Sequence, residues 1–177
     1  MDKITGYRIK KEKGLNFYEH IVWTSRALSV DPLRHVLSHL LVDGNKIVAT
    51  DSRRLAIAED EFFGLLEDGL YLVERVARAV LLIQANDAGT FPNYKQVIPA
   101  QFDTKFEVSG KTAQEAAGHA EFLLGKNGGG SLFLPYLIDA FSDQKMPSME
   151  VHCSGETNAV KVENGARLAI IMPMMLP

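Results

Sequence analysis

The sequence is poor in the features that mark secreted and membrane proteins. Its 177 residues include one cysteine, Cys153, which excludes an intramolecular disulfide, and no Asn-x-Ser/Thr acceptor for N-linked glycosylation occurs. The longest apolar runs, 36–42 and 168–176, are too short to span a bilayer, which takes about 20 residues. The first residues contain no apolar signal core. We therefore expect a cytoplasmic protein with no membrane partner.

Motifs for catalysis and cofactor binding are also missing. No Gly-x-Ser-x-Gly motif occurs, and Cys153 has no evident base partner, so we assign no catalytic nucleophile. Gly110, Lys111 and Thr112 look like the end of a phosphate-binding loop, but Lys105 stands where that loop needs its first glycine. We expect no cofactor, no bound metal and no enzymatic activity.

Two histidines leave one alternative open. His35 and His39 have the four-residue spacing of a helical metal pair, but the strand pattern around them places both on one sheet face. No HExxH motif or cysteine pair completes a site. A small metal-dependent hydrolase that uses these two side chains is therefore an alternative from another functional class, and bound metal in the purified protein would reveal it.

The composition indicates an ordinary globular protein. Hydrophobic residues make up 46% of the chain and charged residues 23%, enough to bury one good core or two small ones that share an interface. The formal net charge of −3 argues against a protein that grips nucleic acid over its whole surface. It leaves room for a local basic face.

The two ends of the chain share one pattern of a strand, a helix and three strands. At the N-terminal end, hydrophobic periodicity predicts a strand over 4–10, a helix over 16–29 and strands over 36–42, 46–50 and 53–58, with Asp43-Gly44 as a hairpin turn. At the C-terminal end, it predicts a strand over 131–134, a helix over 135–142 and strands over 149–153, 158–163 and 167–172, with Asn164-Gly165 as the second tight turn.

The middle of the chain does not repeat this pattern. There we predict a strand over 69–73, a helix over 74–84, a strand over 105–109, and a helix that is opened by the capping box Thr112-Ala-Gln-Glu115 and ended by Gly125. We accordingly divide the chain into an N-terminal half at 1–62, a middle segment at 63–130 and a C-terminal half at 131–177.

Three short segments carry a resemblance to a known family. They are Ala49-Thr-Asp-Ser-Arg-Arg-Leu-Ala56, Phe91-Pro-Asn-Tyr-Lys-Gln-Val-Ile-Pro99 and Ala169-Ile-Ile-Met-Pro-Met-Met-Leu176, whose Met/Pro-rich end suits no internal strand. In this order they resemble the bacterial replicative sliding clamp, the β subunit of DNA polymerase III. The resemblance implies an α+β, DNA-clamp-like fold of two strand-helix-three-strand halves with an inserted middle segment.

In that family the matching segments converge on a hydrophobic pocket that receives short linear peptides. The resemblance assigns this role to ten residues: Thr50, Ser52, Arg53, Arg54, Leu55, Pro99, Ile170, Met172, Pro173 and Met174. The apolar members suit a deformable floor, the prolines suit walls, and Thr50 and Arg54 suit hydrogen bonding to a peptide. Ser52 and Arg53 depart from the family, which often has glycine followed by an aromatic residue or histidine there.

Clamps of this family encircle duplex DNA and direct lysine and arginine side chains at its phosphates. The resemblance makes seven basic residues candidates for that contact: Arg8, Lys10, Lys11, Lys13, Arg26, Arg75 and Arg78. A solvated basic edge is the alternative interpretation of the same residues.

The resemblance thus predicts a non-enzymatic, sliding-clamp-like processivity or docking protein. Its expected partners are double-stranded DNA bound without sequence preference, replication or repair proteins bound through short peptide motifs, and further copies of the same chain in a homo-oligomer. The first alternative is a non-encircling, peptide-binding adaptor that keeps the pocket and has no topological hold on circular DNA.

Overall fold

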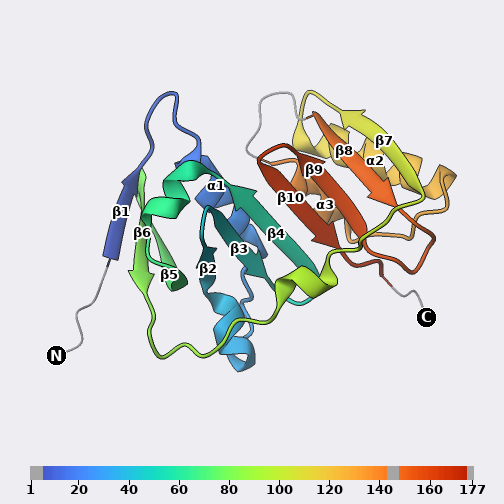
Figure 1. Cartoon of the computed structure of the whole chain (residues 1–177). Helices are drawn as coiled ribbons and strands as arrows, with labels where there is room; N and C mark the ends of the chain where they lie inside the picture. The colour runs from blue at the N-terminus through green and yellow to red at the C-terminus, as the bar shows by residue number, and fades with distance from the viewer. Residues whose placement is uncertain (1–5, 143–147, 175–177) are drawn as a thin grey trace. The chain divides into compact units, whose positions relative to one another are not determined.

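The computed structural model describes residues 6–142 and 148–174, and its internal contacts divide the chain into two compact units (Figure 1). Unit 1 comprises Met1–Pro92 and unit 2 comprises Asn93–Pro177. The sequence had suggested boundaries at 62 and 130 instead. The difference arises from strand pairing. Two strands of the expected middle segment, Gly69–Val76 and Ala79–Gln84, pair with N-terminal strands, whereas a third, Thr104–Ser109, pairs with a C-terminal strand. The segment 91–99, one of the three segments that carry the resemblance, spans the boundary between the units.

Unit 1 is an antiparallel sheet in the spatial order β1-β6-β5-β2-β3-β4, with helix α1 packed against it. Its strands are β1 (Gly6–Lys10), β2 (Leu40–Asp43), β3 (Lys46–Thr50), β4 (Arg54–Glu59), β5 (Gly69–Val76) and β6 (Ala79–Gln84). Its helical elements are α1 (Phe17–Thr24) and the 3-10 segments η1 (Ser25–Ala27), η2 (Pro32–Ser38) and η3 (Glu61–Leu65). The predicted Asp43-Gly44 turn is confirmed, since β2 and β3 pair across it and Gly44 has a φ of 61°.

The helix predicted over 74–84 is wrong, because these residues form the β5–β6 hairpin. Val76, Val80 and Ile83 recur at helical spacing, but their β-branched side chains also suit strands, and pairing with neighbouring strands decides the conformation. The tight turn could not be recognised from the sequence, because Ala77, with a φ of 50°, takes the left-handed conformation that glycine or asparagine usually adopts.

The strand predicted over 36–42 is right only from Leu40 onward. Before it lies the 3-10 segment η2, which begins at Pro32, and the Asp31 side chain accepts a hydrogen bond from the Leu33 backbone N–H at 2.9 Å. Proline at the first turn and a capping carboxylate both favour a helical start. His35 and His39 therefore do not share a strand face.

Unit 2 is an antiparallel sheet in the order β10-β9-β8-β7, with helices α2 and α3 packed against one face. Its elements are the 3-10 segment η4 (Tyr94–Val97), β7 (Thr104–Ser109), α2 (Ala113–Lys126), α3 (Leu134–Ala140), β8 (Ser148–Cys153), β9 (Val160–Asn164) and β10 (Arg167–Ile171). The Asn164-Gly165 turn is confirmed between β9 and β10. No helix in the described ranges of either unit is long and apolar enough to cross a membrane.

Two details of unit 2 differ from the sequence expectation. No strand forms over 131–134, where α3 begins at Leu134. The capping box is confirmed, since Thr112 Oγ1 accepts the Glu115 backbone N–H at 3.1 Å, but α2 runs through Gly125 to Lys126. The left-handed residue that follows the helix is Gly128, with a φ of 70°.

Alternation along the strands separates the core of unit 2 from its open face. On β8, Met149, Val151 and Cys153 are buried, whereas Glu150 and His152 between them are not. The buried face of α2 consists of Ala116, Ala117, Ala120 and Leu124, and its small alanine side chains allow the helix to lie close to the sheet.

Gly130 is placed where no side chain fits, which yields a stability prediction. A Cβ atom there would overlap the backbone carbonyl oxygen of Glu156 and lie 2.7 Å from Pro173 Cβ. We expect Gly130→Ala to lower the free energy of unfolding by about 1–3 kcal/mol. Gly118→Ala is the matched control, because a Cβ at this position in α2 meets nothing within 4 Å. The control should raise the free energy of unfolding by about 0.5–1 kcal/mol, as helix propensity predicts. Urea unfolding of both variants measures the difference, and equal effects of the two substitutions would contradict the assigned close approach.

Candidate peptide-binding and DNA-binding surfaces

The residues predicted to form the peptide pocket come from both units, and each unit's part is described by itself. In unit 1 the β3–β4 turn is organised by Asp51. Its Oδ1 accepts the backbone N–H groups of Arg53 at 2.9 Å and Arg54 at 3.0 Å, and its Oδ2 lies 3.1 Å from Arg54 Nε. A carboxylate that accepts from its own turn in this way fixes the local backbone.

Several side chains that the sequence assigned to a peptide are used within this turn. Thr50 Oγ1 donates to the Arg54 carbonyl oxygen at 2.6 Å, and the Arg54 guanidinium donates to the Arg26 carbonyl oxygen. Leu55 is buried, with 2% of its surface exposed. Ser52 and Arg53 are exposed at the tip of the turn. The direct contacts available to a ligand from this turn therefore come from its tip.

Ser52 has a backbone conformation that L-residues rarely adopt. Its φ is 76°, in the left-handed region, and it occupies the position where the resembling family often has glycine. Arg34 Nη1 donates to Ser52 Oγ and, at 3.1 Å, to the Asp51 carbonyl oxygen. In addition, the Ser52 backbone N–H donates to Thr50 Oγ1 at 3.1 Å, so both the side chain and the backbone of Ser52 are hydrogen-bonded.

In unit 2 the chain after β10 presents two exposed methionines. Met172 is 46% exposed and Met174 is 41% exposed, whereas Ile170 on the strand is only 1% exposed. Pro99 and Pro173 are half-buried. The Met174 backbone N–H donates to the Ser131 carbonyl oxygen at 2.8 Å, so this segment is fixed along the residues that precede α3.

Met174 also lines a groove of about 540 Å³ within unit 2. Its apolar lining comes from Leu124, Leu132 and Met174, and its polar lining includes Ser131, Thr157, Glu121 and Glu156. Polar and apolar groups contribute about equally to this lining, and Met174 is its most exposed apolar side chain because Leu124 and Leu132 are almost fully buried. Sequence reasoning missed this groove, because it joins the end of α2, the β8–β9 connection and the chain after β10.

An exposed aromatic residue near the same segment, and a half-buried one beside it, were also missed. Phe133, 44% exposed, precedes α3, and its ring meets that of Tyr136 edge to face with a centroid separation of 4.9 Å. The signal in the sequence was an aromatic residue next to the start of a helix. This signal was not recognised because a strand was predicted over 131–134.

The basic residues predicted to contact DNA lie in unit 1 and differ in their engagement. Arg75 donates to the Val22 carbonyl oxygen at 3.2 Å and to Ser25 Oγ at 3.0 Å, and Lys11 Nζ lies 3.1 Å from Glu19 Oε1. Arg26 lies in η1 and is half-buried. Three of the seven candidates therefore either contact other groups of unit 1 or are half-buried in it.

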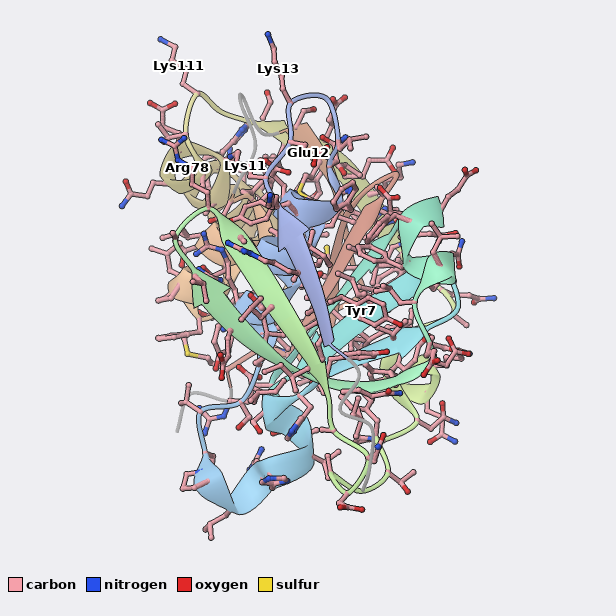
Figure 2. All side chains as sticks on the ribbon, turned by 90° about the vertical axis from the view of Figure 1, so that its left-hand side faces the viewer. Tyr7, Lys11, Glu12, Lys13, Arg78 and Lys111 are labelled. Carbon is pink, nitrogen blue, oxygen red and sulfur yellow. The ribbon has the colours of Figure 1, made fainter. Side chains whose placement is uncertain are left out.

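The other four basic residues form an exposed group at one edge of the sheet. Arg8 and Lys10 alternate along β1, Lys13 follows in the loop, and Arg78 lies in the β5–β6 turn. The loop and the turn adjoin, because the Lys11 backbone N–H donates to the Arg78 carbonyl oxygen at 3.1 Å. Figure 2 shows Lys13 projecting outward from this loop. We call Arg8, Lys10, Lys13 and Arg78 the basic edge cluster.

The histidine pair and the cysteine show no arrangement suited to catalysis. His39 is buried, and its Nδ1 lies 3.0 Å from the His35 carbonyl oxygen, so this nitrogen is engaged with the backbone. In the described ranges the group of side chains arranged like metal ligands is Glu150, His152 and Glu163, which includes neither histidine of the pair. Burial raises the pKa of the Cys153 thiol, which disfavours the reactive thiolate.

Electrostatics at the Glu150 group depend on neighbouring lysines. A hydrogen bond from Lys105 lowers the pKa of Glu150 below its usual range. Burial, and secondly the Lys161 ammonium, lower the pKa of His152. The imidazole is therefore neutral at neutral pH.

Comparison with solved structures identifies the architecture. The DNA polymerase sliding clamp of Pseudomonas aeruginosa superposes with a TM-score of 0.67 at 14% sequence identity, over 97% of this chain and 66% of that one. DNA polymerase III β subunit of Thermotoga maritima gives a TM-score of 0.66 at 17% identity, over 100% of this chain and 67% of that one. This chain has the fold of the bacterial sliding clamps. The predicted α+β, clamp-like fold is thereby confirmed.

The same architecture occurs in a clamp that was solved with a bound peptide. A third clamp, the Helicobacter pylori β clamp bound to a DNA ligase peptide, matches with a TM-score of 0.62 at 10% identity, over 99% of this chain and 67% of that one. The chain thus spans about two thirds of the length of the solved clamps it matches. No protein-family model and no curated protein matches the sequence. At these identities the likeness establishes the clamp fold.

The role of Asp51 in the clamp-fold β3–β4 turn can be tested directly. Asp51→Ala removes two N–H acceptors and the contact with Arg54, so we expect a loss of about 1–3 kcal/mol in the free energy of unfolding. The Arg53 and Arg54 amides should then exchange faster with solvent. Asp51→Asn keeps one carbonyl acceptor and should have a smaller effect on both. Unchanged amide exchange in Asp51→Ala would show that the turn is held by other contacts.

Proposed function

We propose that this protein is a non-enzymatic, sliding-clamp-like processivity or docking protein. It holds double-stranded DNA without sequence preference and presents an apolar surface to short peptide motifs of replication or repair proteins. The likeness to sliding clamps over nearly the whole chain carries this proposal. Sliding clamps are processivity factors rather than enzymes, which fits the arrangement of His39 and Cys153. Because its proposed partner is DNA, we expect the protein to act in the cytoplasm.

Peptide docking is supported by the Helicobacter pylori clamp that was solved with a DNA ligase peptide. In this chain the exposed methionines Met172 and Met174 offer an adaptable apolar contact. The bond between the Met174 N–H and Ser131 fixes this segment before a ligand arrives, which reduces the entropy lost on binding. The tip of the β3–β4 turn, Ser52 and Arg53, supplies polar contacts.

DNA binding is assigned to the basic edge cluster. Its four cations are exposed and belong to one sheet edge, so they can meet phosphates without a rearrangement of the fold. A net charge of −3 keeps the rest of the surface from attracting DNA strongly. We therefore expect weak binding to DNA. The protein should stay on DNA mainly because it encircles the duplex.

Encirclement requires several copies of the chain or another partner. In the described ranges β1 pairs only with β6, and β7 pairs only with β8. Each of these strands has backbone groups available for pairing with a second molecule. We propose a homo-oligomer joined through these strands. The alternative is the non-encircling adaptor, which would retain the peptide surface and bind as a single copy.

The peptide surface leads to a mutational prediction. A peptide rich in glutamine, leucine and phenylalanine should bind with a Kd on the order of micromolar, and Met172→Asp or Met174→Asp should weaken binding at least about tenfold. Each variant places a charge against apolar groups that the peptide would bury. Leu65→Asp is the control, because Leu65 is 77% exposed on η3 in unit 1 and is outside the assigned surface. Calorimetric titration measures all three, and equal affinities of the folded variants would contradict the assignment.

The basic edge cluster leads to a prediction about salt dependence. Binding to short linear duplex should weaken steeply with salt, and the double variant Lys13→Ala/Arg78→Ala should reduce the slope of log K against log salt by up to about two. Lys46→Ala/Lys95→Ala removes the same charge elsewhere and should leave the slope unchanged.

The same protein should persist on nicked circular DNA and leave linear DNA, and its mass in solution should exceed that of one chain. Equal retention on both DNA forms by a monomer would favour the adaptor.

A further inference from the structure

The open face of the unit 2 sheet has its charged residues arranged in two rows. Strand register aligns Glu107 on β7, Glu150 on β8 and Glu163 on β9 as one row across the sheet. The neighbouring row on the same face consists of Lys105, His152 and Lys161. Glu150 and Glu163 are directly opposite one another, an arrangement in which two carboxylates repel. Lys105 and Lys161 each pair with one of these carboxylates and offset part of the repulsion, and a further cation between the carboxylates would offset more of it.

His152 directs a buried ring nitrogen at these two carboxylates. Its Nε2 is buried and lies 3.0 Å from Glu163 Oε1 and 3.5 Å from Glu150 Oε2. One potential ligand atom from each of the three side chains lies within 4.8 Å of the others. One imidazole nitrogen and two carboxylate oxygens this close together are atoms of the kind that bind transition metals.

We propose that Glu150, His152 and Glu163 bind a divalent transition-metal ion, with zinc as the best match. One imidazole nitrogen and two carboxylate oxygens form a mixed N/O set that suits zinc and disfavours magnesium and calcium, which prefer oxygen ligands alone. Tetrahedral zinc places its ligand atoms about 3.4 Å apart, and Nε2 already lies 3.0 Å from Glu163 Oε1 and 3.5 Å from Glu150 Oε2, so the movement still needed is an adjustment of the two carboxylates. The Glu150 side chain is 44% exposed and is free to make this movement.

The two lysines of the neighbouring row control the strength of the site. Lys105 Nζ lies 2.8 Å from Glu150 Oε1, the oxygen that does not face His152, so it orients the carboxylate and opposes an added cation. Lys161 Nζ lies 2.6 Å from Glu163 Oε1 and is also held 5.3 Å from the centre of the Phe102 ring. Lys105 is 57% exposed and Lys161 is 17% exposed. Lys105 is therefore the lysine whose removal should strengthen metal binding with the least disturbance.

The experiment is calorimetric titration of the whole purified chain with zinc chloride. We expect one zinc ion per chain with a Kd in the micromolar range, at least about tenfold weaker binding for His152→Ala, and weaker binding for Glu150→Gln. Lys105→Gln should bind zinc about three- to tenfold more tightly, since a positive charge near the ion is removed. Magnesium in excess should not displace zinc. The tightening by Lys105→Gln separates an organised site from general attraction to surface carboxylates.

His119→Ala is the matched control, because His119 is exposed on α2 and belongs to the same unit. It should leave zinc affinity unchanged. Circular dichroism of each variant checks that the fold is retained, and because the altered side chains lie on the open face we expect no change. The absence of stoichiometric zinc binding, equal binding by folded His152→Ala, or weaker binding by Lys105→Gln would each overturn the proposal.

Discussion

Burial of one sheet face under helices is the constraint on which both units depend. In unit 2, the side chains of β8 alternate between a buried set that includes Val151 and an open set that includes His152. Alanines on α2 allow the helix backbone to lie close to the buried set. Once this face is fixed, the strand register is fixed too, because a shift of one residue would move every apolar side chain to water. The placement of the charged rows on the open face follows from the same requirement.

The sequence was most informative where local chemistry and tertiary packing agree. Asp43-Gly44 and Asn164-Gly165 predicted turns correctly, because glycine provides the left-handed conformation that a tight turn requires. The β5–β6 hairpin was missed because Ala77 takes that conformation without a glycine, which leaves no local signal. Likewise, the last residues of η2, 36–38, were assigned to a strand because the proline and aspartate that start η2 were not taken into account. The boundary between the two units depends on which strands pair with one another, and hydrophobic periodicity does not reveal that pairing.

The candidate surfaces were predictable to a smaller extent. The resemblance singled out the β3–β4 turn, but only the structure showed that Thr50 and Arg54 are engaged inside it. The group of Glu150, His152 and Glu163 could not be recognised beforehand, because Glu163 joins the other two through the β8–β9 register. Spacing within one segment reveals ligands on one element, whereas a site shared between strands requires their alignment.

The edge strands β1 and β7 also bear on colloidal behaviour. A strand of this kind is a template onto which further chains can add without limit, as in fibrils. On β1, Arg8 and Lys10 give the exposed side chains one sign of charge, so two copies of β1 repel when they approach each other. On β7, Lys105 and Glu107 provide both signs. The charge pattern therefore disfavours stacking of β1 on itself and directs it toward a partner strand that carries negative charge.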